Sequence, residues 1–288
     1  MLELSGFQTD TCTVSVAGDT FNTAVYLARH GLEVTYATSL GLDPISDLIL
    51  SKIQGEGIDT SMILRAPGAP GMYAISVDEV GERSFTYWRA NSVARQFFTI
   101  AGVDRLLERA LDADMLYLSG ITLSLFGMAD LVRLRDLAAA MRSAGKVVAF
   151  DTNYRQSGWQ SAEHAREAIG LISPFVSMAL PTFEDEALLH GDAKAEQTAQ
   201  RWLDLGAEEV VVKQGAQGAY VAGHDWVMPP AKVVPRDTTG AGDSFNGAYI
   251  SARIAGAHPR IAARMGHELA ARVIMTPGAI LPRDAEVQ

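Results

Sequence analysis

Short apolar runs alternate with longer helical patterns through the second half of the chain. The helical segments repeat their apolar positions at amphipathic spacing, and the short runs are rich in valine and other strand-forming residues. This alternation is typical of strand–helix units that build a mostly parallel sheet with helices on both faces. The predicted strands are residues 115–118, 146–150, 176–180 and 209–213.

One predicted helix covers residues 125–144, and Gly145 would end it because glycine readily adopts the left-handed conformation of a helix C-terminus. Nearer the carboxyl end, the patterns predict further strands at 218–227 and 231–235 and helices at 241–255 and 259–275.

Two stretches near the amino terminus break the alternation. Residues 71–89 place GMYAISV and RSFTYWR on either side of a DEVGE turn, which is the spacing of an antiparallel hairpin. We expect residues 2–16 and 71–89 to form a small β lid on a single α/β domain that spans residues 1–288. Such a domain usually begins with a buried apolar strand, so the polar start predicts a first core strand upstream of Met1.

Composition narrows the class of protein. The 288 residues are 48% hydrophobic and 20% charged, which excludes disordered and fibrous chains. The formal net charge of −10 makes nucleic acid and anionic membranes poor partners. Cys12 is the only cysteine, so no intrachain disulfide can form. With no apolar membrane-length run and no export signal, we expect a cytoplasmic protein.

The most informative stretch is RDTTGAGDSFNG at residues 236–247. Gly240, Ala241 and Gly242 let a ligand approach the backbone closely, and the pattern that follows begins a helix whose N–H groups would bind an anion. Asp243 lies in the first turn of that helix and would take a proton from a hydroxyl. The combination predicts phosphoryl transfer to an alcohol. The alternative is a capped helix after a glycine turn.

The same stretch, through DTTGAGDSF, resembles the C-terminal signature of the ribokinase-like (PfkB) carbohydrate kinases. AGDTFNTAVYLARHG at 17–31 resembles the glycine-containing substrate segment of that family, and YLSGITL, FDTNYRQSGW and PGAILPRD extend the resemblance over nearly the whole chain. It implies a ribokinase-like three-layer fold with a mostly parallel central sheet and a small β lid. The motifs are most similar to those of kinases of 2-dehydro-3-deoxy-D-gluconate, which implies ATP-dependent phosphorylation of its terminal hydroxyl to the 6-phosphate.

Residues for the sugar are expected in the segment at 17–31. Polar residues at the start of its helix would bind sugar hydroxyls while an apolar face packs inward. As an alternative, Asp19 and Thr20 simply cap the helix. The sugar-binding residues expected here are Gly18, Asp19 and Asn22, and the apolar face is Phe21, Ala24, Val25 and Ala28.

A carboxylate on the sugar would need cations. Tyr73 and Tyr87 lie in the predicted lid, and Tyr87 and Arg89 share a strand face because they are two residues apart. Arg155 follows a strand end in DTNYR, where α/β sheets bind ligands. Arginine pairs with carboxylates through two hydrogen bonds, so Arg89 with Arg155 predicts a sugar acid. Fructokinases share DxNxR, and a solvated outer lid face is the alternative for Arg89.

The nucleotide is expected at VVVKQGAQG, after the strand at 209–213, and at the glycine-rich turn of 236–247. Lys213 would meet phosphate, although a lysine at a strand end is often solvated. The nucleotide-binding residues predicted in these two stretches are Lys213, Gly215, Gly218, Thr238, Gly240 and Gly242.

For Mg²⁺, many family members carry an NxxE motif, and this chain has PTFEDE in its place, with Thr182 and Asp185 at the two positions. Asp185 is the predicted outer-shell acid, with Glu184 and Glu186 as further candidates. An acidic cluster at a helix N-terminus is the alternative. The family resemblance also implies K⁺ activation through the loops at 237–239 and 273–278.

Three other functions stay open. A fructokinase or another neutral-sugar kinase would need no carboxylate, and a non-catalytic sugar- or nucleotide-binding protein would share the fold. A nicotinamide oxidoreductase is disfavoured because the GxGxxG fingerprint is missing. Exposed lid strands are sheet edges that commonly need covering, so we expect a homo-oligomer formed through the lid.

Overall fold

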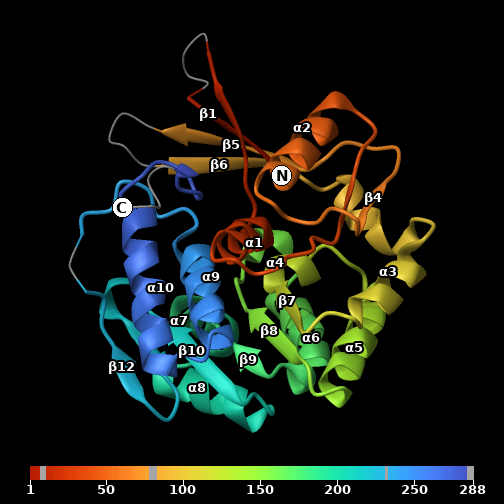
Figure 1. Ribbon diagram of the computed structural model, residues 1–288. Helices are drawn as coiled ribbons and strands as arrows, with labels where there is room; N and C mark the ends of the chain where they lie inside the picture. The colour runs from red at the N-terminus through yellow and green to blue at the C-terminus, as the bar shows by residue number, and fades with distance from the viewer. Residues whose placement is uncertain (7–10, 78–82, 231–232, 284–288) are drawn as a thin grey trace. The chain divides into compact units, whose positions relative to one another are not determined.

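The computed structural model describes residues 1–6, 11–77, 83–230 and 233–283. The chain forms two compact units, Met1–Leu106 (unit 1) and Leu107–Gln288 (unit 2). Figure 1 colours the chain by residue number, from red at the N-terminus to blue at the C-terminus.

In its described part, unit 2 is built on a six-stranded sheet with the order β12–β11–β10–β9–β8–β7. The strands from β7 to β10 run parallel, and β11 and β12 add an antiparallel edge. Val148 and Val211 are 0% exposed, as expected for parallel strands with both faces covered. The strands are β7 (Met115–Ser119), β8 (Val147–Asp151), β9 (Met178–Ala179), β10 (Glu209–Lys213), β11 (Ala219–Val221) and β12 (Asp225–Val227).

The helices of unit 2 cover both faces of this sheet. Strands β7 to β10 follow one another in a single direction, so right-handed crossovers place the connecting helices α5 to α8 on one face. Helices α9 and α10 pack side by side against the other (Figure 1). The helices are α4 (Gly120–Leu123), α5 (Met128–Ser143), α6 (Ala162–Ile172), α7 (Phe183–His190), α8 (Ala195–Asp204), α9 (Ala241–Ile254) and α10 (Pro259–Val273), with short 3-10 turns η2 (Gln156–Gly158), η3 (Ser173–Phe175) and η4 (Gly215–Gln217).

These elements confirm the predicted three-layer α/β fold, with four local differences. The stretch predicted as strand at 218–227 forms two strands, β11 and β12, which pair antiparallel. Strand β9 is shorter than predicted, although Leu180 still donates to Phe150 O at 2.8 Å. The helix predicted from residue 125 begins at Met128, because α4 and a turn precede it, and it ends before Gly145, whose φ is +73°. The strand predicted at 231–235 is wrong for residues 233–235, which have no regular structure; residues 231–232 lie outside the described residues.

Unit 1 contains a four-stranded sheet with the order β2–β1–β5–β6. Both predicted lid stretches therefore enter one sheet, joined by the parallel pair β1 and β5, and the predicted hairpin is confirmed as the antiparallel pair β5 and β6. Its turn at 78–82, like residues 7–10, lies outside the described residues. The strands are β1 (Leu2–Ser5), β2 (Thr13–Val16), β5 (Met72–Val77) and β6 (Arg83–Trp88).

Helix α1 (Asp19–Arg29) also lies in unit 1 and is largely buried. Every residue from Phe21 to Leu27 is buried, Asn22 included, whereas Ala28 is only half-buried. Phe21, Ala24 and Val25 of the predicted apolar face are thus buried as expected, Ala28 is not, and burial extends beyond that face. The remaining elements of unit 1 are β3 (Thr38–Leu40), paired in parallel with β4 (Ile63–Arg65), α2 (Pro44–Gly55) and η1 (Val93–Thr99), and the boundary between the units falls within α3 (Val103–Ala110). No helix within the described ranges combines the length and apolarity that a bilayer crossing requires.

Candidate active site

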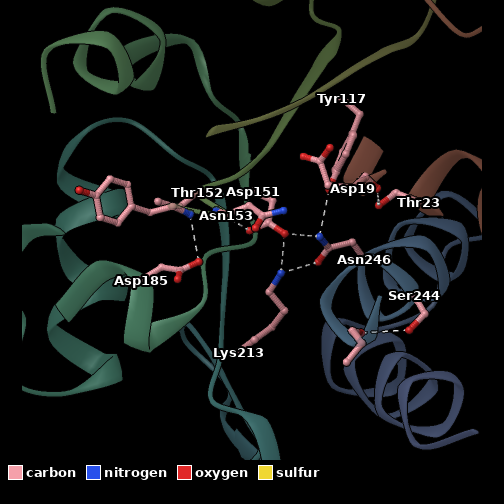
Figure 2. A network of polar contacts seen from close by, with 12 residues as sticks. Asp19, Thr23, Tyr117, Asp151, Thr152, Asn153, Asp185, Lys213, Ser244 and Asn246 are labelled. Atoms are coloured by element: carbon pink, nitrogen blue, oxygen red, sulfur yellow. Dashed lines mark hydrogen bonds and ion pairs between the residues drawn. The ribbon is translucent and has the colours of Figure 1, made fainter. Parts of the chain in front are cut away.

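Three buried polar side chains of unit 2 meet at the carboxyl ends of two parallel strands (Figure 2). Asp151 is the last residue of β8, Lys213 is the last residue of β10, and Asn246 lies in α9. Lys213 Nζ lies 2.8 Å from Asp151 Oδ2 and 2.9 Å from Asn246 Oδ1, and Asn246 Nδ2 donates to Asp151 Oδ2 at 2.6 Å. Ligands of open α/β sheets bind at this edge.

Lys213 is only 6% exposed, so the alternative of a solvated lysine is wrong. The ammonium lies directly beneath the start of α9, because a β-carbon placed on Gly242 would be 3.6 Å from Lys213 Nζ. A cation therefore accompanies the positive end of the α9 dipole, and both favour an anion.

The glycine-rich turn forms the N-terminus of α9, as predicted. Gly240 is the N-cap with φ +76°, and a β-carbon there would lie 2.7 Å from Ala279 Cβ, so both conformation and packing require glycine. The N–H of Ala241 donates to Thr238 O at 3.3 Å, whereas the N–H of Gly242 finds no acceptor among the described residues. Gly242 thus supplies an open donor for a phosphate oxygen.

Asp243 lies in the first turn of α9, where the prediction placed it, and is 9% exposed. The positive end of the helix dipole stabilises a carboxylate at this position. Thr238, one turn earlier, is exposed.

The two loops predicted for K⁺ are joined by one carboxylate. Asp237 accepts hydrogen bonds from Thr239 N at 3.0 Å and from Gly278 N at 2.6 Å, and its own N–H donates to Ile274 O. The loops at 237–239 and 273–278 are therefore neighbours in the fold.

Of the other predicted nucleotide residues, Gly215 begins η4 with φ +49° and Gly218 has φ +105°. A β-carbon on Gly218 would lie 2.6 Å from Val227 O in β12, so packing within the sheet is sufficient reason for this glycine. Contact of Gly215 and Gly218 with the nucleotide stays a prediction.

Arg155 and Asp185, predicted for the sugar acid and for Mg²⁺, form an ion pair. Arg155 Nη1 lies 3.1 Å and 3.2 Å from the two carboxylate oxygens of Asp185 and donates to Tyr154 O at 2.9 Å. Within the described part of the chain, Nε and Nη2 of Arg155 have no acceptor, and 52% of the side chain is exposed. Two edges of the guanidinium thus stay available to a ligand carboxylate.

Burial, with a smaller contribution from nearby Asp151, raises the pKa of Asp185 to a net value of about 6, despite the opposing effects of Arg155 and Lys213. The folded protein therefore binds this proton more tightly than the unfolded chain does. Stability from this group is complete below about pH 4 and is lost as the pH rises through 6.

We accordingly expect Asp185→Asn to stabilise the ligand-free protein at pH 7.5, by about 3 kcal/mol at most, because a pKa unit corresponds to about 1.4 kcal/mol. At pH 4 the gain should nearly vanish. Thermal or denaturant unfolding of the wild type and the variant at the two pH values measures this gain in stability. An Asp185→Asn variant less stable than the wild type at pH 7.5 would contradict the burial of an ionised Asp185.

Glu186 and Glu184, the further candidates for outer-shell acids, lie in different surroundings. Glu186 is 0% exposed, and it accepts from Thr152 Oγ1, from Trp202 Nε1 at 3.1 Å and from Arg201. Its carboxylate therefore joins the loop after β8 to helix α8, while Glu184 faces solvent.

The loop after β8 contains a further residue that sequence reasoning missed. Asn153 has φ +31°, which is uncommon for a non-glycine residue, and is 8% exposed. Its N–H donates to Asp151 Oδ1 at 3.2 Å, and its buried Oδ1 has no hydrogen-bond partner among the described residues. Unpaired buried oxygens are rare, and residues with uncommon backbone conformations cluster at sites that bind ligands.

In unit 1, Gly18 is the N-cap of α1, and its N–H donates to Asn22 Oδ1 at 3.2 Å. Neither alternative cap is used: Asp19 is the first helical residue, and Thr20 Oγ1 lies 2.9 Å from Tyr36 Oη. The capping alternative is wrong, and Asn22 is more deeply buried, at 3% exposure, than a freely available sugar ligand.

Three of the residues predicted for the sugar, Tyr73, Tyr87 and Arg89, lie close together in unit 1, with Arg89 directly after the end of β6. Tyr73 and Tyr87 are cross-strand partners with ring centroids 5.8 Å apart, and the Arg89 guanidinium lies 4.4 Å from the centroid of the Tyr87 ring. Tyr87 is 42% exposed, whereas Tyr73 is 6% exposed and its hydroxyl donates to Glu3. Tyr87 and Arg89 therefore offer the more accessible pair.

Comparisons with known proteins show the family of this chain. The model of the pfkB family carbohydrate kinases matches residues 4–286. The 2-dehydro-3-deoxygluconokinase of Dickeya dadantii is 38% identical over 296 residues, covering 99% of this chain and 95% of that protein. The crystal structure of a PfkB protein from Polaromonas sp. JS666 has a TM-score of 0.85 at 28% identity, covering 100% and 96% of the two chains. A candidate ribokinase II from Escherichia coli, in complex with ATP and Mg²⁺, has a TM-score of 0.81 at 21% identity, covering 97% and 91%, and shares the fold. This chain therefore belongs to the pfkB family of carbohydrate kinases.

Proposed function

We propose that the protein is a 2-dehydro-3-deoxygluconokinase, which transfers the γ-phosphoryl group of ATP to the terminal hydroxyl of 2-dehydro-3-deoxy-D-gluconate. The products are ADP and the 6-phosphate. The observation that carries the proposal is the start of α9, where Asp243, the open N–H of Gly242 and the Lys213 ammonium gather at one sheet edge. The shared activity name of a relative 38% identical over nearly the full chain supports the substrate.

Each group at the start of α9 has a separate task. Asp243 accepts the proton of the attacking hydroxyl, which makes the oxygen a better nucleophile. The N–H of Gly242 and the end of the α9 dipole stabilise the negative charge on the transferred phosphoryl group. Lys213 adds a fixed positive charge against the phosphates, and the neighbouring predicted residues Gly215, Gly218 and Thr238 complete the nucleotide site.

The residues beside this site fit Mg²⁺. The ion usually keeps several waters and needs only one or two protein carboxylates beside the phosphates. Asp185 supplies a carboxylate, and the unpaired Oδ1 of Asn153 is an oxygen suited to a hydrated cation. When bound, Mg²⁺ neutralises charge on the phosphates, and Asp185 holds its water shell.

Recognition of the sugar acid is assigned to the arginines. Arg155 keeps two edges of its guanidinium open, and Arg89 is held by stacking on Tyr87. Gly18, Asp19, Asn22 and Tyr73 are the further sugar-binding residues of the proposal.

The proposal also includes ion activation, self-association and location. The loops at 237–239 and 273–278 bind K⁺ through backbone carbonyls. Copies of the chain associate through the sheet of unit 1, where Val14 and Trp88 on the outer strands are 46% and 54% exposed. The protein works in the cytoplasm.

ADP release in a coupled assay tests the activity, with ketodeoxygluconate, gluconate, fructose and ribose at equal concentrations. We expect ketodeoxygluconate to give the highest kcat/KM. Faster turnover of fructose or ribose would replace the proposal with a neutral-sugar kinase, and no release with any sugar would favour a non-catalytic binding protein.

A further inference from the structure

Asp151 sits at the centre of the polar cluster, yet it is not among the groups that act on the reactants in the proposed reaction. One carboxylate oxygen, Oδ2, accepts from both Lys213 Nζ and Asn246 Nδ2. The other, Oδ1, accepts from Asn153 N at 3.2 Å. Asp151 is 3% exposed, so these three donors replace the water that an ionised carboxylate would otherwise hold.

Asn246 completes the arrangement from the opposite side. Its Oδ1 accepts from Lys213 and its Nδ2 donates to Asp151, so the amide can take only one orientation. Tyr117 Oη, on β7, lies 3.0 Å from the same Nδ2 and supports that orientation. Strand β8, strand β10 and helix α9 therefore converge on the lysine ammonium.

The Lys213 ammonium has one N–H donor left for a ligand. A lysine side chain carries three N–H bonds, and within the described residues two acceptors, Asp151 Oδ2 and Asn246 Oδ1, lie within hydrogen-bond distance of Nζ. The ammonium is buried beside Gly242, where the open N–H of α9 also lies. A remaining ammonium donor beside a helix N-terminus suits a phosphate oxygen.

We infer that Asp151 is a positioning residue, which together with Asn246 holds the charged Lys213 ammonium beside Gly242 for a phosphate of the nucleotide. The inference rests on the proposed kinase function. Asp151 does not touch the nucleotide; it acts through Lys213.

The sign of the effect separates positioning from plain electrostatics. If Asp151 only contributed negative charge, its removal would strengthen the binding of an anionic nucleotide. If it holds Lys213 in place, its removal leaves a buried ammonium without a counter-ion, which loses its proton or turns away, and nucleotide binding weakens.

Isothermal titration calorimetry with MgADP measures the nucleotide affinity of Asp151→Asn, Lys213→Met and the double variant. We expect Lys213→Met to weaken MgADP binding by about 10- to 100-fold, the usual range for a hydrogen bond to a charged group, and Asp151→Asn by about tenfold. In the Lys213→Met background, Asp151→Asn should change the affinity by less than about threefold, since its effect passes through the lysine. The KM for ATP should rise in Asp151→Asn while the KM for the sugar stays unchanged.

Asp192→Asn is the matched control, because Asp192 is also buried in unit 2 and pairs with Arg201 at 2.6 Å, away from α9. It should lose comparable stability without loss of MgADP affinity. If Asp151→Asn does not fold, Tyr117→Phe replaces it, with an expected weakening of about threefold that disappears in the Lys213→Met background.

Unchanged or tighter MgADP binding in Asp151→Asn, or effects of the two single variants that multiply in the double variant, would overturn the inference. If Tyr117→Phe has to replace Asp151→Asn, unchanged MgADP affinity in Tyr117→Phe would also overturn the inference. Failure of the wild-type protein to bind MgADP would instead overturn the proposed function.

Discussion

Asp243→Asn should lower kcat by roughly 10²-fold or more while leaving nucleotide binding nearly intact, because a general base typically contributes about 10² to 10⁴ in rate. The asparagine keeps the size of the side chain and its place in the first turn of α9, but it cannot accept the proton of the sugar hydroxyl. Ground-state binding by Gly242 and Lys213 does not depend on that proton. The loss should therefore appear in kcat and leave the affinity for MgADP within about threefold.

Ser244→Ala is a suitable control for Asp243→Asn. Ser244 is the next residue in the same helical turn and donates to Ala241 O at 3.0 Å, so the substitution disturbs the turn without removing a base. Steady-state kinetics with the sugar acid and titration with MgADP separate the two effects. A change of less than about threefold in kcat for Asp243→Asn would remove Asp243 from the mechanism.

Arg89→Ala and Arg155→Ala should each raise KM for ketodeoxygluconate by about 10- to 100-fold and change KM for fructose far less. A charge-assisted hydrogen bond contributes about 1.5 to 3 kcal/mol, and the neutral sugar has no carboxylate to lose. Tyr87→Phe removes one neutral hydroxyl, worth about 1 kcal/mol, and should have a smaller effect.

The ion pair between Arg155 and Asp185 calls for one more variant, because Arg155→Ala also removes the partner of Asp185. Arg155→Lys keeps a positive charge near Asp185 but loses the planar fork, so it should still raise KM for the acid. Arg135→Ala, at an exposed ion pair on α5, is the control and should leave both sugars unaffected.

The readout for the arginine variants is the ratio of kcat/KM values for ketodeoxygluconate and fructose. We expect this ratio to fall in both alanine variants. If both activities decline equally, or if the wild-type protein already prefers fructose, the assignment of a sugar acid fails and a neutral-sugar kinase takes its place.

The predicted site residues divide according to whether local sequence sufficed to place them. Gly240 and Asp243 follow from a short motif, because a small-residue turn and the first turn of a helix lie within a few residues of each other. Lys213 was placed correctly at a strand end, but its burial was not predicted. Its partners are 62 and 33 residues away, and no local pattern links a lysine to Asp151 and Asn246.

Some signals for the missed residues were present in the sequence. Asp151 directly follows the strand predicted at 146–150, within FDTNYR, and Asn246 lies three residues after Asp243 in the predicted helix at 241–255, between the apolar Phe245 and the small Gly247. A polar residue in such a position indicates a buried hydrogen-bond partner but does not identify it. Similarly, Arg155 and Asp185 each pointed to a ligand, and only the structure shows that they also pair with each other.

The sequence by itself determined the strand–helix alternation, the hairpin of unit 1 and the glycine-rich start of α9, because the periods of helices and strands and the freedom of glycine act over a few residues. The tertiary structure decided which strands are neighbours, and with them the charge partners. It joined β1 to β5 in parallel, buried all of Phe21 to Leu27 in α1, and brought Asp151, Lys213 and Asn246 to one sheet edge. These outcomes depend on burial and pairing between distant segments. A buried charge is unfavourable unless it is paired, and the topology determines which partner lies within hydrogen-bond distance.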